Sequence, residues 1–431
     1  MKQHLQKQNL QSVAIVGLGY VGLPLALLAA KKGYRVIGID VDGKKTALLN
    51  KKIVPFIDGE LSKQIKKTSF LASTDFSKIS EVDIVVVCVP TPVFKNKDPD
   101  YSFVKAACKS IATNLHKKQL LVLESTVNPG VCEELVIPIL EKWSGLSVGQ
   151  DIFLAHCPER INPGDKKWNV SNIPRVVGAV NKKSLSRAQS FYRSIISGDI
   201  YPMASLREAE AVKIVENSFR NINIAFVNEL AKSFAVLGID VVSVIKGAAT
   251  KPFAFLAHYP GCGIGGHCIP VDPYYLINYA KKKGFTHELL LKSCQTNKMM
   301  PFYTVNLLKE SLVDLGKEVK GTKITVLGVA YKPNLDDYRE SPALVIVEIL
   351  KNLGANVSIY DPFVKKFSVG SLTEAIQGAS GLILATAHDV FRKIDPVLLK
   401  KAGVLAIIDG RNVWNKKKFL RAGLVYKGIG R

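Results

Sequence analysis

The sequence has no apolar run that approaches the 18 or so residues needed to span a membrane. It also has no CxxC pair, so the ligand spacing of a structural zinc site is missing. The N-terminal stretch MKQHLQKQNL is polar and runs directly into a predicted strand, without the apolar core of a signal peptide. We therefore expect a cytoplasmic protein with no metal centre.

Acidic residues are scarce relative to basic ones: 36 Asp and Glu stand against 59 Lys and Arg, a formal net charge of +23. Such an excess suits nucleic acid, a membrane surface or an anionic small substrate. The lysines are scattered in pairs and triples, as at 281–283 and 416–418, and are not interleaved with aromatic residues. This pattern favours solvated faces, so we expect neither a nucleic-acid nor a membrane partner.

The seven cysteines are odd in number, and most stand inside apolar runs, which is typical of a reducing compartment. The composition, 47% hydrophobic and 22% charged, is that of a globular protein. At 431 residues, the chain is expected to form two or three domains.

The first 200 residues alternate predicted strands with helices. Residues 12–42 follow the order strand, glycine turn, helix, strand, and further buried strands are expected at 83–90, 120–125 and 151–159. This order predicts a doubly wound parallel sheet. After Gly321, a second unit of the same order lacks the glycine fingerprint, so it should bind something other than the same dinucleotide.

A long helical stretch begins at Ser205. So long a helix usually joins domains or subunits, although a core helix within one domain fits the periodicity equally well. We expect two Rossmann-like doubly wound domains joined by this helix. Its apolar side chains recur every three or four residues and share one face: Val212, Val215, Phe219, Ile222, Phe226, Leu230 and Phe234.

The stretch GLGYVG lies between a predicted strand and a predicted helix, the context that a dinucleotide fingerprint requires. Its glycines would form the turn, admit the pyrophosphate and pack the helix, whose N-terminus faces the phosphates. Asp40 ends the next strand and would accept hydrogen bonds from the adenosine ribose while repelling a 2′-phosphate. The pattern predicts NAD. The predicted cofactor-binding residues of the turn are Gly17, Gly19, Tyr20, Val21 and Gly22.

Polar residues follow several predicted strands, at the sheet edge where ligands of open α/β sheets bind. Pro90 and Thr91 come from VPTP, and Glu124 and Thr126 from EST. Taken alone, each of them is equally well explained as a cap or turn residue.

Two further pairs of residues are candidates for chemistry. Glu159 and Arg160 lie at the tip of CPERINPGD, where a glutamate could act as a base or position water. An ion pair between these neighbours is an equal alternative. Lys213 and Asn217 are four apart on the long helix and share a face, so they could stabilise an oxyanion. A solvated lysine is the default alternative.

The stretch GCGIGGHCIPVDP, residues 261–273, presents Cys268 on an almost bare backbone that would let a substrate approach. A thiol has a pKa of about 8.5 and needs help to ionise, which Asp272 or Lys213 could give. His267 is a neighbour whose side chain should point away from Cys268. A metal or disulfide role lacks partners in the sequence.

With these residues in view, the sequence resembles the UDP-glucose/GDP-mannose dehydrogenase family, and within it the branch acting on UDP-N-acetylhexosamines. The resemblance covers nearly the whole chain, from VGLGYVGLPLA through VPTP, EST, CPERINPG, AEAVKIVENSFRNINIAFVNELA and GIGGHCIPVDPYYL to YKPNLDDYRESPA, YDP, ATAHDVF and DGRN. It implies an oxidation of a sugar C6 alcohol to an aldehyde and then to a uronic acid, with two NAD reduced.

The resemblance also implies roles for single residues. Cys268 matches the nucleophile that forms a thiohemiacetal and a thioester. Lys213 and Asn217 match the oxyanion pair, and Asp272 a carboxylate that assists proton transfer. Thr126 and Glu159 match residues that place water and act as base. The implied substrate-binding residues are Glu159, Arg160, Lys213, Asn217, Arg220, Asn223, Phe253, Tyr259, Gly265, Lys332 and Arg339.

From the resemblance we expect an NAD-binding domain over 1–204 and a central helical and dimerisation domain over 205–308. A UDP-sugar-binding domain is expected over 309–431. The dimer would form on the helix near 205–238. The expected substrate is UDP-N-acetylglucosamine, with UDP-N-acetylmannosamine, UDP-N-acetylgalactosamine or UDP-glucose as alternatives. A non-catalytic binder, and a one-step dehydrogenase with a structural cysteine, remain rival hypotheses.

Two positions depart from the family pattern. Pro163 stands where the UDP-glucose branch has a second glutamate, which leaves water activation to Glu159, Thr126 and Asp272. Cys262 stands where the N-acetyl branch usually has proline, and a thiol so close to Cys268 suggests oxidative inactivation.

Overall fold

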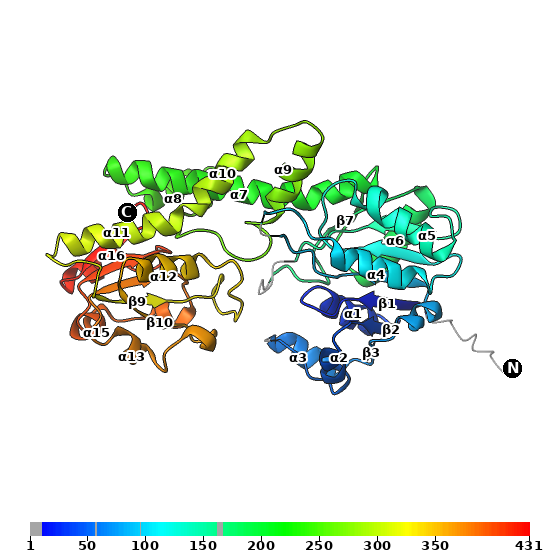
Figure 1. Cartoon of the computed structure of the whole chain (residues 1–431), viewed down its shortest axis with the longest axis horizontal. Coiled ribbons are helices and arrows are strands. Elements are labelled where there is room, and N and C mark those ends of the chain that lie inside the picture. The colour runs from blue at the N-terminus through cyan, green and yellow to red at the C-terminus, as the bar shows by residue number, and fades with distance from the viewer. Residues whose placement is uncertain (1–10, 57, 95, 162–166) are drawn as a thin grey trace. The chain divides into compact units, whose positions relative to one another are not determined.

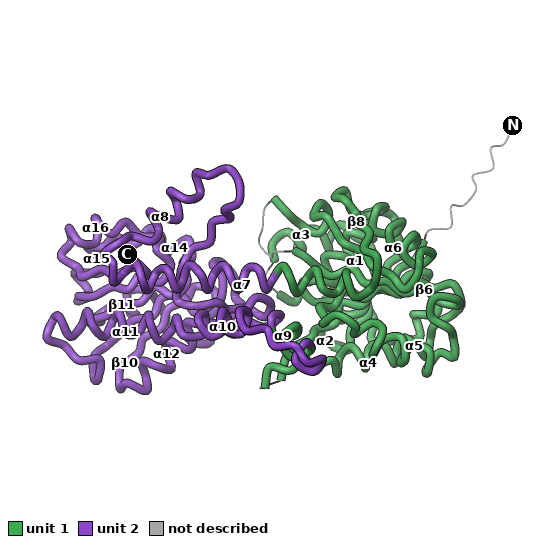
Figure 2. The backbone as a smooth tube through the Cα atoms, turned by 90° about the horizontal axis from the view of Figure 1, so that it is seen from above, with its two compact units in different colours: residues 1–216, 274–279 green, residues 217–273, 280–431 purple. Residues whose placement is uncertain are grey.

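The computed structural model describes residues 11–56, 58–94, 96–161 and 167–431. The predictions about the N-terminal stretch and about Pro163 lie outside the described residues. The chain divides into two compact units (Figure 2). Unit 1 comprises residues up to 216 together with 274–279, and unit 2 comprises 217–273 together with 280–431.

Unit 1 contains an eight-stranded sheet in the order β3-β2-β1-β4-β5-β6-β7-β8. All neighbouring strands are parallel except β6 and β7, which are antiparallel. The parallel strands predicted in this region are confirmed, and the antiparallel β7 was not foreseen. The strands are β1 (Ser12–Val16), β2 (Arg35–Ile39), β3 (Leu71–Ser73), β4 (Ile84–Val87), β5 (Leu120–Leu123), β6 (Phe153–His156), β7 (Arg175–Ala179) and β8 (Ile200–Pro202).

Helices cover both faces of this sheet (Figure 1). Val13 and Ile15 of β1 belong to one hydrophobic cluster, while Ala14 and Val16 belong to another, because alternate residues of a strand point to opposite faces. A strand buried on both faces is continuously apolar, as the sequence pattern indicated. The helices are α1 (Gly22–Lys31), α2 (Gly43–Asn50), α3 (Gly59–Lys66), α4 (Ser102–Ala112), α5 (Ile137–Ser144) and α6 (Lys182–Ile195).

Unit 2 contains a five-stranded parallel sheet in the order β10-β9-β11-β12-β13. The strand–turn–helix–strand unit predicted after Gly321 is confirmed as β9 (Lys323–Leu327), α12 (Pro342–Asn352) and β10 (Asn356–Tyr360). The remaining strands are β11 (Gly381–Leu384), β12 (Ala406–Asp409) and β13 (Val425–Gly428). Further helices are α8 (Val241–Ala248), α10 (Glu288–Lys298), α11 (Met300–Val313), α13 (Leu372–Ile376), α14 (Asp389–Arg392), α15 (Pro396–Lys401) and α16 (Lys416–Arg421).

The predicted long helix is α7 (Leu206–Val236), a single helix of 31 residues. Its apolar stripe is only partly covered: Leu230 and Phe234 pack against the core of unit 2, but the middle of the stripe stays exposed. Phe219 and Phe226 are 48% and 56% exposed, whereas Asn217, Asn221 and Asn228 are almost completely buried. The chain thus buries a row of amides against its own loops and leaves large apolar side chains of the stripe uncovered.

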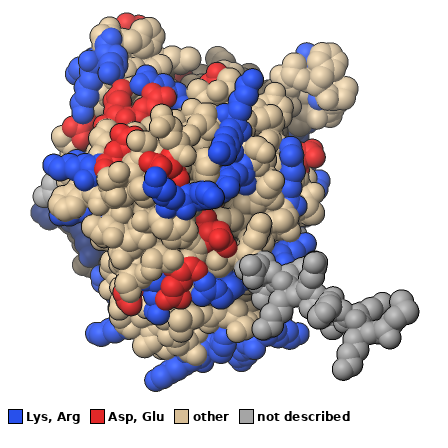
Figure 3. Space-filling model, turned by 90° about the vertical axis from the view of Figure 1, so that its right-hand side faces the viewer, with Lys and Arg blue, Asp and Glu red and all other residues tan. Residues whose placement is uncertain are grey.

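The charged residues do not gather into one patch on the face drawn in Figure 3, where groups of Lys and Arg alternate with Asp and Glu. Among the described residues, no three His, Cys, Asp or Glu side chains form a group that could hold a metal ion. No helix in the described part of the chain has the length and apolar character needed to cross a membrane.

Candidate active site

The glycine turn after β1 has the geometry that a bound pyrophosphate needs. Gly17 has a φ of +93°, and a Cβ there would lie 2.8 Å from the carbonyl oxygen of Cys88. A Cβ on Gly22 would lie 1.9 Å from the oxygen of Gly17. A Cβ on Gly19 would have no described heavy atom within 4 Å, so the space in front of Gly19 is open. The turn therefore fits a dinucleotide phosphate above the N-terminus of α1.

Asp40, at the end of β2, is fixed beside this turn. One carboxylate oxygen accepts the Leu18 N–H at 2.8 Å and the Lys45 Nζ at 2.7 Å, and the other accepts the Asp42 N–H at 3.0 Å. These three hydrogen bonds leave one of the four lone-pair positions of the carboxylate for a ribose hydroxyl. Lys45 was not foreseen from the sequence, although it could have been found as a basic residue in the first turn of the helix that follows the acid.

The other predicted cofactor residues of unit 1 line loops at the carboxyl ends of the strands. Tyr20 is 42% exposed, and the centroid of its ring lies 4.2 Å from the centroid of the Phe56 ring. The Thr91 carbonyl accepts a hydrogen bond from the Tyr275 hydroxyl. The Ser125 hydroxyl donates to the Val89 carbonyl at 2.7 Å, which ties the loop holding Pro90 to the loop holding Thr126.

Glu159 does not pair with its neighbour Arg160, so that alternative is wrong. Arg160 pairs with Glu216, whereas Glu159 lies 2.7 Å from Nη2 of Arg175, a fully buried arginine at the start of β7. The other oxygen of Glu159 accepts the backbone N–H groups of Arg160 and Ile161, both at 2.5 Å. These donors hold the carboxylate in one orientation.

Glu124, left open as a turn residue, is buried and contacts the same arginine. Its carboxylate lies 3.4 Å from Nη1 of Arg175 and accepts the Tyr192 hydroxyl at 2.6 Å. Burial raises the pKa of Glu124 to about 7, although Arg175 acts in the opposite direction. Glu124 is therefore a second carboxylate of this site.

In unit 2, Cys268 is half-buried and stands on a tight turn that leads into α9 (Asp272–Lys282). Its carbonyl accepts the N–H groups of Val271 at 3.0 Å and Asp272 at 2.8 Å. The buried Asp272 carboxylate accepts the Asn217 Nδ2 at 2.6 Å. The structure thus brings together three predicted catalytic residues, with Lys213 one helical turn before Asn217 on α7.

The glycines before Cys268 are required by packing, which the sequence-based interpretation did not foresee. A Cβ on Gly265 would lie 2.7 Å from the Cβ of Tyr331, and a Cβ on Gly266 would lie 2.8 Å from the ring of that tyrosine. A Cβ on Gly263 would lie 2.9 Å from Pro342. The space that these glycines leave is filled by side chains of unit 2.

Asparagines on the buried face of α7 hold this loop. Asn221 donates to the Ile269 carbonyl at 3.1 Å, and the side-chain oxygen of Asn228 accepts the Gly261 N–H at 3.0 Å. Neither residue was foreseen from the sequence. With Asn217 they recur at spacings of four and seven, which places amides on one helix face within an otherwise apolar pattern.

Cys262 is fully buried, with its thiol 3.4 Å from the Ala385 carbonyl. Burial raises the pKa of this thiol. A buried, protonated thiol is poorly suited to oxidation, so the suspected oxidative role is not supported and Cys262 acts as a core residue.

The predicted substrate residues of unit 2 have different settings. Arg339 forms an ion pair with Asp337, and its carbonyl accepts the Gly266 N–H at 3.0 Å, so its segment lies against the cysteine loop. Asn223 donates to a carbonyl of its own helix. The side chains of Arg220, Phe253 and Tyr259 are exposed, and Lys332 is half-buried.

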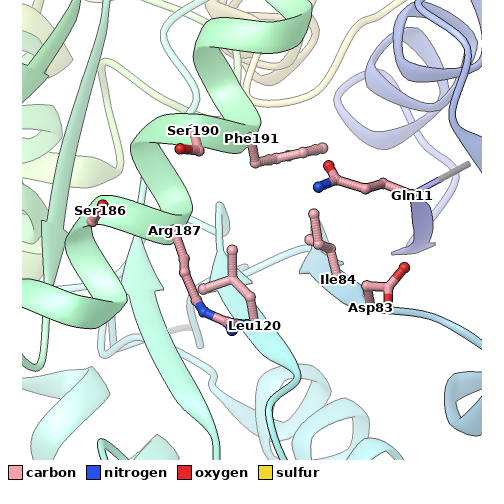
Figure 4. A pocket seen from close by; sticks show the side chains of 8 residues that line it. All are labelled: Gln11, Asp83, Ile84, Leu120, Ser186, Arg187, Ser190 and Phe191. Carbon is pink, nitrogen blue, oxygen red and sulfur yellow. The ribbon is translucent and has the colours of Figure 1, made fainter. Parts of the chain in front are cut away.

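A hollow of about 540 Å³ in unit 1 holds none of the predicted site residues. Asp83, Ile84 and Leu120 line it at the amino ends of β4 and β5, and Arg187 reaches it from α6 (Figure 4). It therefore lies at the sheet edge opposite the glycine turn.

In a comparison with known protein families, three successive segments of the chain match domains of the same family. The models of the UDP-glucose/GDP-mannose dehydrogenase family match residues 11–196 as NAD binding domain, 207–299 as central domain and 325–416 as UDP binding domain.

Individual relatives are similar over almost their full length. The UDP-N-acetyl-D-mannosamine dehydrogenase of Pyrococcus horikoshii is 35% identical, covering 97% of this chain and 99% of the relative. The UDP-N-acetyl-D-glucosamine 6-dehydrogenase of Pseudomonas aeruginosa is 36% identical, covering 91% and 94%. A solved structure of a UDP-D-ManNAc dehydrogenase from Pyrococcus horikoshii superimposes with a TM-score of 0.92 at 34% identity, covering 98% of this chain and 99% of the other. The chain therefore belongs to the UDP-glucose/GDP-mannose dehydrogenase family, and its unit 1 carries the NAD binding domain of that family.

Proposed function

We propose that this protein oxidises the C6 alcohol of UDP-N-acetyl-D-glucosamine to the uronic acid in two steps. The observation that carries the proposal is the turn of unit 2 that presents Cys268 beside the hydrogen-bonded Asn217 and Asp272. A one-step alcohol dehydrogenase has no need of a nucleophile, whereas the second oxidation, from aldehyde to acid, does.

Bound NAD supplies the hydride acceptor for both oxidations. Gly17, Gly19 and Gly22 would hold its pyrophosphate, and Asp40 with Lys45 its adenosine ribose. The remaining steps fall to side chains of this chain.

Cys268, as thiolate, would attack C6 of the aldehyde to form a thiohemiacetal, and loss of a hydride from C6 would leave a thioester. Lys213 and Asn217 would stabilise the oxyanion. One N–H of the Asn217 amide is held by Asp272, which fixes the amide plane and leaves the second N–H for the substrate oxygen. Water, positioned by Thr126 and deprotonated by Glu159, would attack the thioester carbon and release the acid and the thiolate.

The similar proteins are named for two different hexosamines. The similar proteins include UDP-N-acetyl-D-glucosamine 6-dehydrogenases and UDP-N-acetyl-D-mannosamine dehydrogenases, so UDP-N-acetyl-D-mannosamine is the second candidate. The two sugars are C2 epimers, and a changed hydrogen bond is worth about 1 kcal/mol. UDP-GlcNAc, UDP-ManNAc, UDP-GalNAc and UDP-glucose should be compared by kcat/KM with NAD. Best turnover on UDP-glucose would contradict the N-acetyl assignment.

The covalent mechanism predicts two NADH for each sugar consumed. Cys268→Ser should form little or no acid, since a hydroxyl is a far weaker nucleophile. Cys262→Ala is a matched control from the same stretch: it should lower stability but keep two NADH per sugar. One NADH per turnover with an aldehyde product would instead favour the one-step dehydrogenase.

We further propose that residues 1–204, 205–308 and 309–431 act as NAD-binding, central and UDP-sugar-binding parts. The central part would form a homodimer through α7. The exposed Phe219 and Phe226 on that helix support this, because soluble monomers rarely leave such a stripe uncovered. In sedimentation, Phe226→Asp should yield monomers. Val236→Asp, at an 88% exposed position on another face of α7, is the control.

A further inference from the structure

The Arg175 cluster, defined here as Arg175, Glu124, Glu159 and Tyr192, places one guanidinium between two carboxylates inside unit 1. Arg175 and Glu124 have no exposed side-chain surface, and only 8% of the Glu159 side chain is exposed. The guanidinium contacts both acids, at 2.7 Å for Glu159 and 3.4 Å for Glu124. The cluster thus contains one permanent positive charge and two groups that can each carry a negative one.

The antiparallel strand β7 explains how the cluster forms. Ala155 pairs with Ala179 and His156 with Gly178, so the same register, continued, sets Glu159 opposite Arg175. Glu124 directly follows β5, the parallel neighbour of β6, and its carbonyl accepts the Glu159 N–H at 3.5 Å. Because β7 runs in the opposite direction, its first residue, Arg175, lies at the sheet edge where Glu124 follows β5 and Glu159 follows β6.

Two ionised carboxylates beside one guanidinium would leave an uncompensated negative charge in a buried site, which is costly. The donors differ between the two acids. Glu159 receives two backbone N–H groups, whereas Glu124 receives the Tyr192 hydroxyl. The negative charge is therefore better stabilised on Glu159, and the raised pKa of Glu124 agrees with this division.

We propose that Glu124 and Arg175 are positioning residues for Glu159: while Glu124 holds a proton, the whole of Arg175 is left to hold the Glu159 carboxylate in its orientation as a base. When Glu124 ionises, it competes for the same guanidinium. This inference rests on the proposed role of Glu159 in thioester hydrolysis.

The titratable groups that face Glu124 come from four directions. Arg175 lies on β7, Glu159 and Cys157 follow β6, Tyr192 lies on α6, and Cys88 follows β4 with its sulfur 3.9 Å from the carboxylate. Burial raises the pKa values of Cys88, Cys157 and Tyr192, so these three groups stay neutral while Glu124 titrates.

The protonation of Glu124 can be followed without turnover, by infrared difference spectra of the full-length protein. The wild type minus Glu124→Gln difference should show a protonated-carboxyl stretch at pH 5.5 that disappears with a midpoint near pH 7. In Tyr192→Phe, the ionised form loses a donor, so the midpoint should move to higher pH. Absence of the band at pH 5.5 in wild type and in Tyr192→Phe would overturn the proposal.

The effect on Glu159 is measured by rapid quench, as the rate at which the acyl-enzyme releases the uronic acid between pH 5.5 and 9. The Glu124→Gln rate relative to wild type should rise by about threefold as wild-type Glu124 ionises, because the ionised Glu124 competes for Arg175 and Glu159 is then held less firmly in its orientation. Tyr192→Phe should move this change to higher pH and provides the test if Glu124→Gln does not fold.

The outcomes separate this inference from the proposed function. If wild type produces no NADH from any UDP-sugar, the proposed function fails and the inference fails with it. If wild type produces two NADH but the hydrolysis profiles of wild type, Glu124→Gln and Tyr192→Phe coincide, only the inference fails. In that case the cluster is structural, and the variants differ only in thermal stability.

Discussion

The two sheets begin with the same device and use it differently. In unit 1, Gly17 opens the turn, and Asp40 accepts the Leu18 N–H. In unit 2, Gly328, with a φ of +82°, opens the corresponding turn, and Asp361 accepts the Val329 and Ala330 N–H groups. Each aspartate thus fastens the turn of the preceding strand to the end of the next one.

The difference lies in what else surrounds each acid. Asp40 is 7% exposed, and its charged partner is the flexible side chain of Lys45. Asp361 is completely buried and also accepts the Phe363 and Val364 N–H groups and the Nε2–H of His388. Asp40 can still accept a hydrogen bond from a ribose hydroxyl, whereas the acceptor positions of Asp361 are all occupied by donors of unit 2.

The turns themselves also differ in the space that they leave for a ligand. Where unit 1 has Gly19 facing open space, unit 2 has the fully buried Ala330, whose carbonyl accepts the Thr386 hydroxyl at 2.5 Å. A Rossmann-like unit can therefore retain the acid and the first glycine for structural reasons alone. The presence of either residue is not by itself a sign of a dinucleotide site.

The largest effect is expected for Asp361→Asn. Removing a buried charge that accepts bonds from four N–H groups and His388 should lower the free energy of unfolding by about 3 kcal/mol. Asp40→Asn, the matched variant in unit 1, should instead raise the KM for NAD and reduce the preference of the enzyme for NAD over NADP. Chemical denaturation and cofactor kinetics would show the difference. Equal loss of NAD affinity in both variants would contradict the comparison.

The pH dependence of stability should report the same acid. Burial would raise the pKa of Asp361, but hydrogen bonds from His388 and Ala330 outweigh it and hold the pKa well below its usual value. The stabilisation is therefore fully present above the unfolded pKa of about 3.9 and is lost as the pH falls below it. Melting temperatures from pH 6 to 3 should fall more steeply in wild type than in Asp361→Asn.

The next largest effect is expected for Gly22→Ala. The new Cβ would meet the Gly17 oxygen at 1.9 Å, so the turn must move, at a cost of about 2 kcal/mol and with loss of NAD binding. Gly59→Ala, at the start of α3, is the control, because a Cβ there meets no described atom within 4 Å. Titration of NAD by calorimetry distinguishes the two, and unchanged affinity in Gly22→Ala would show that the turn is not the phosphate site.

A smaller effect is expected for Lys45→Met. The variant keeps much of the side-chain length but removes the charge held 2.7 Å from Asp40. Loss of about 1 kcal/mol in binding corresponds to a roughly fivefold higher Kd for NAD, with little change in stability because the pair is partly exposed. Lys44→Met, one residue earlier on the same helix, serves as the control. The comparison would weaken if both variants bound NAD equally well.

The smallest effect is expected for Ala330→Gly. A glycine at this buried position should cost about 0.5–1 kcal/mol of stability through added chain entropy. It should not create dinucleotide binding in unit 2, since Asp361 remains saturated. Equilibrium dialysis against NAD should therefore give one site per chain, and a second site would show that Ala330 alone closes this turn.

Much of this architecture could be predicted because it depends on local patterns. Continuous apolar strands, the glycine turn and the long helix each leave a periodic signal within a few tens of residues. The three residues Asn217, Asp272 and Cys268 were also foreseen as candidates. Their hydrogen bonds were not, because those depend on how the 261–272 loop folds back onto α7.

What could not be predicted depends on pairing between distant segments. Arg175 reaches Glu124 and Glu159 only because β7 runs antiparallel to β6, a choice that no short stretch records. The packing role of the glycines before Cys268 was missed because their neighbour, Tyr331, is some 65 residues away in the sequence. The apolar stripe of α7 was expected from its period, but its partial exposure was not, because periodicity alone does not tell which face the chain buries.

The inverted burial of α7 has a consequence for the behaviour of the protein in solution. With amides turned inward and Phe219 and Phe226 turned outward, part of the apolar surface of the helix gains nothing from the folding of a single chain. If a second copy covers it, association and folding become linked equilibria, and the unfolding midpoint rises with total protein concentration by mass action. Dilution would then act on this enzyme as a mild denaturant.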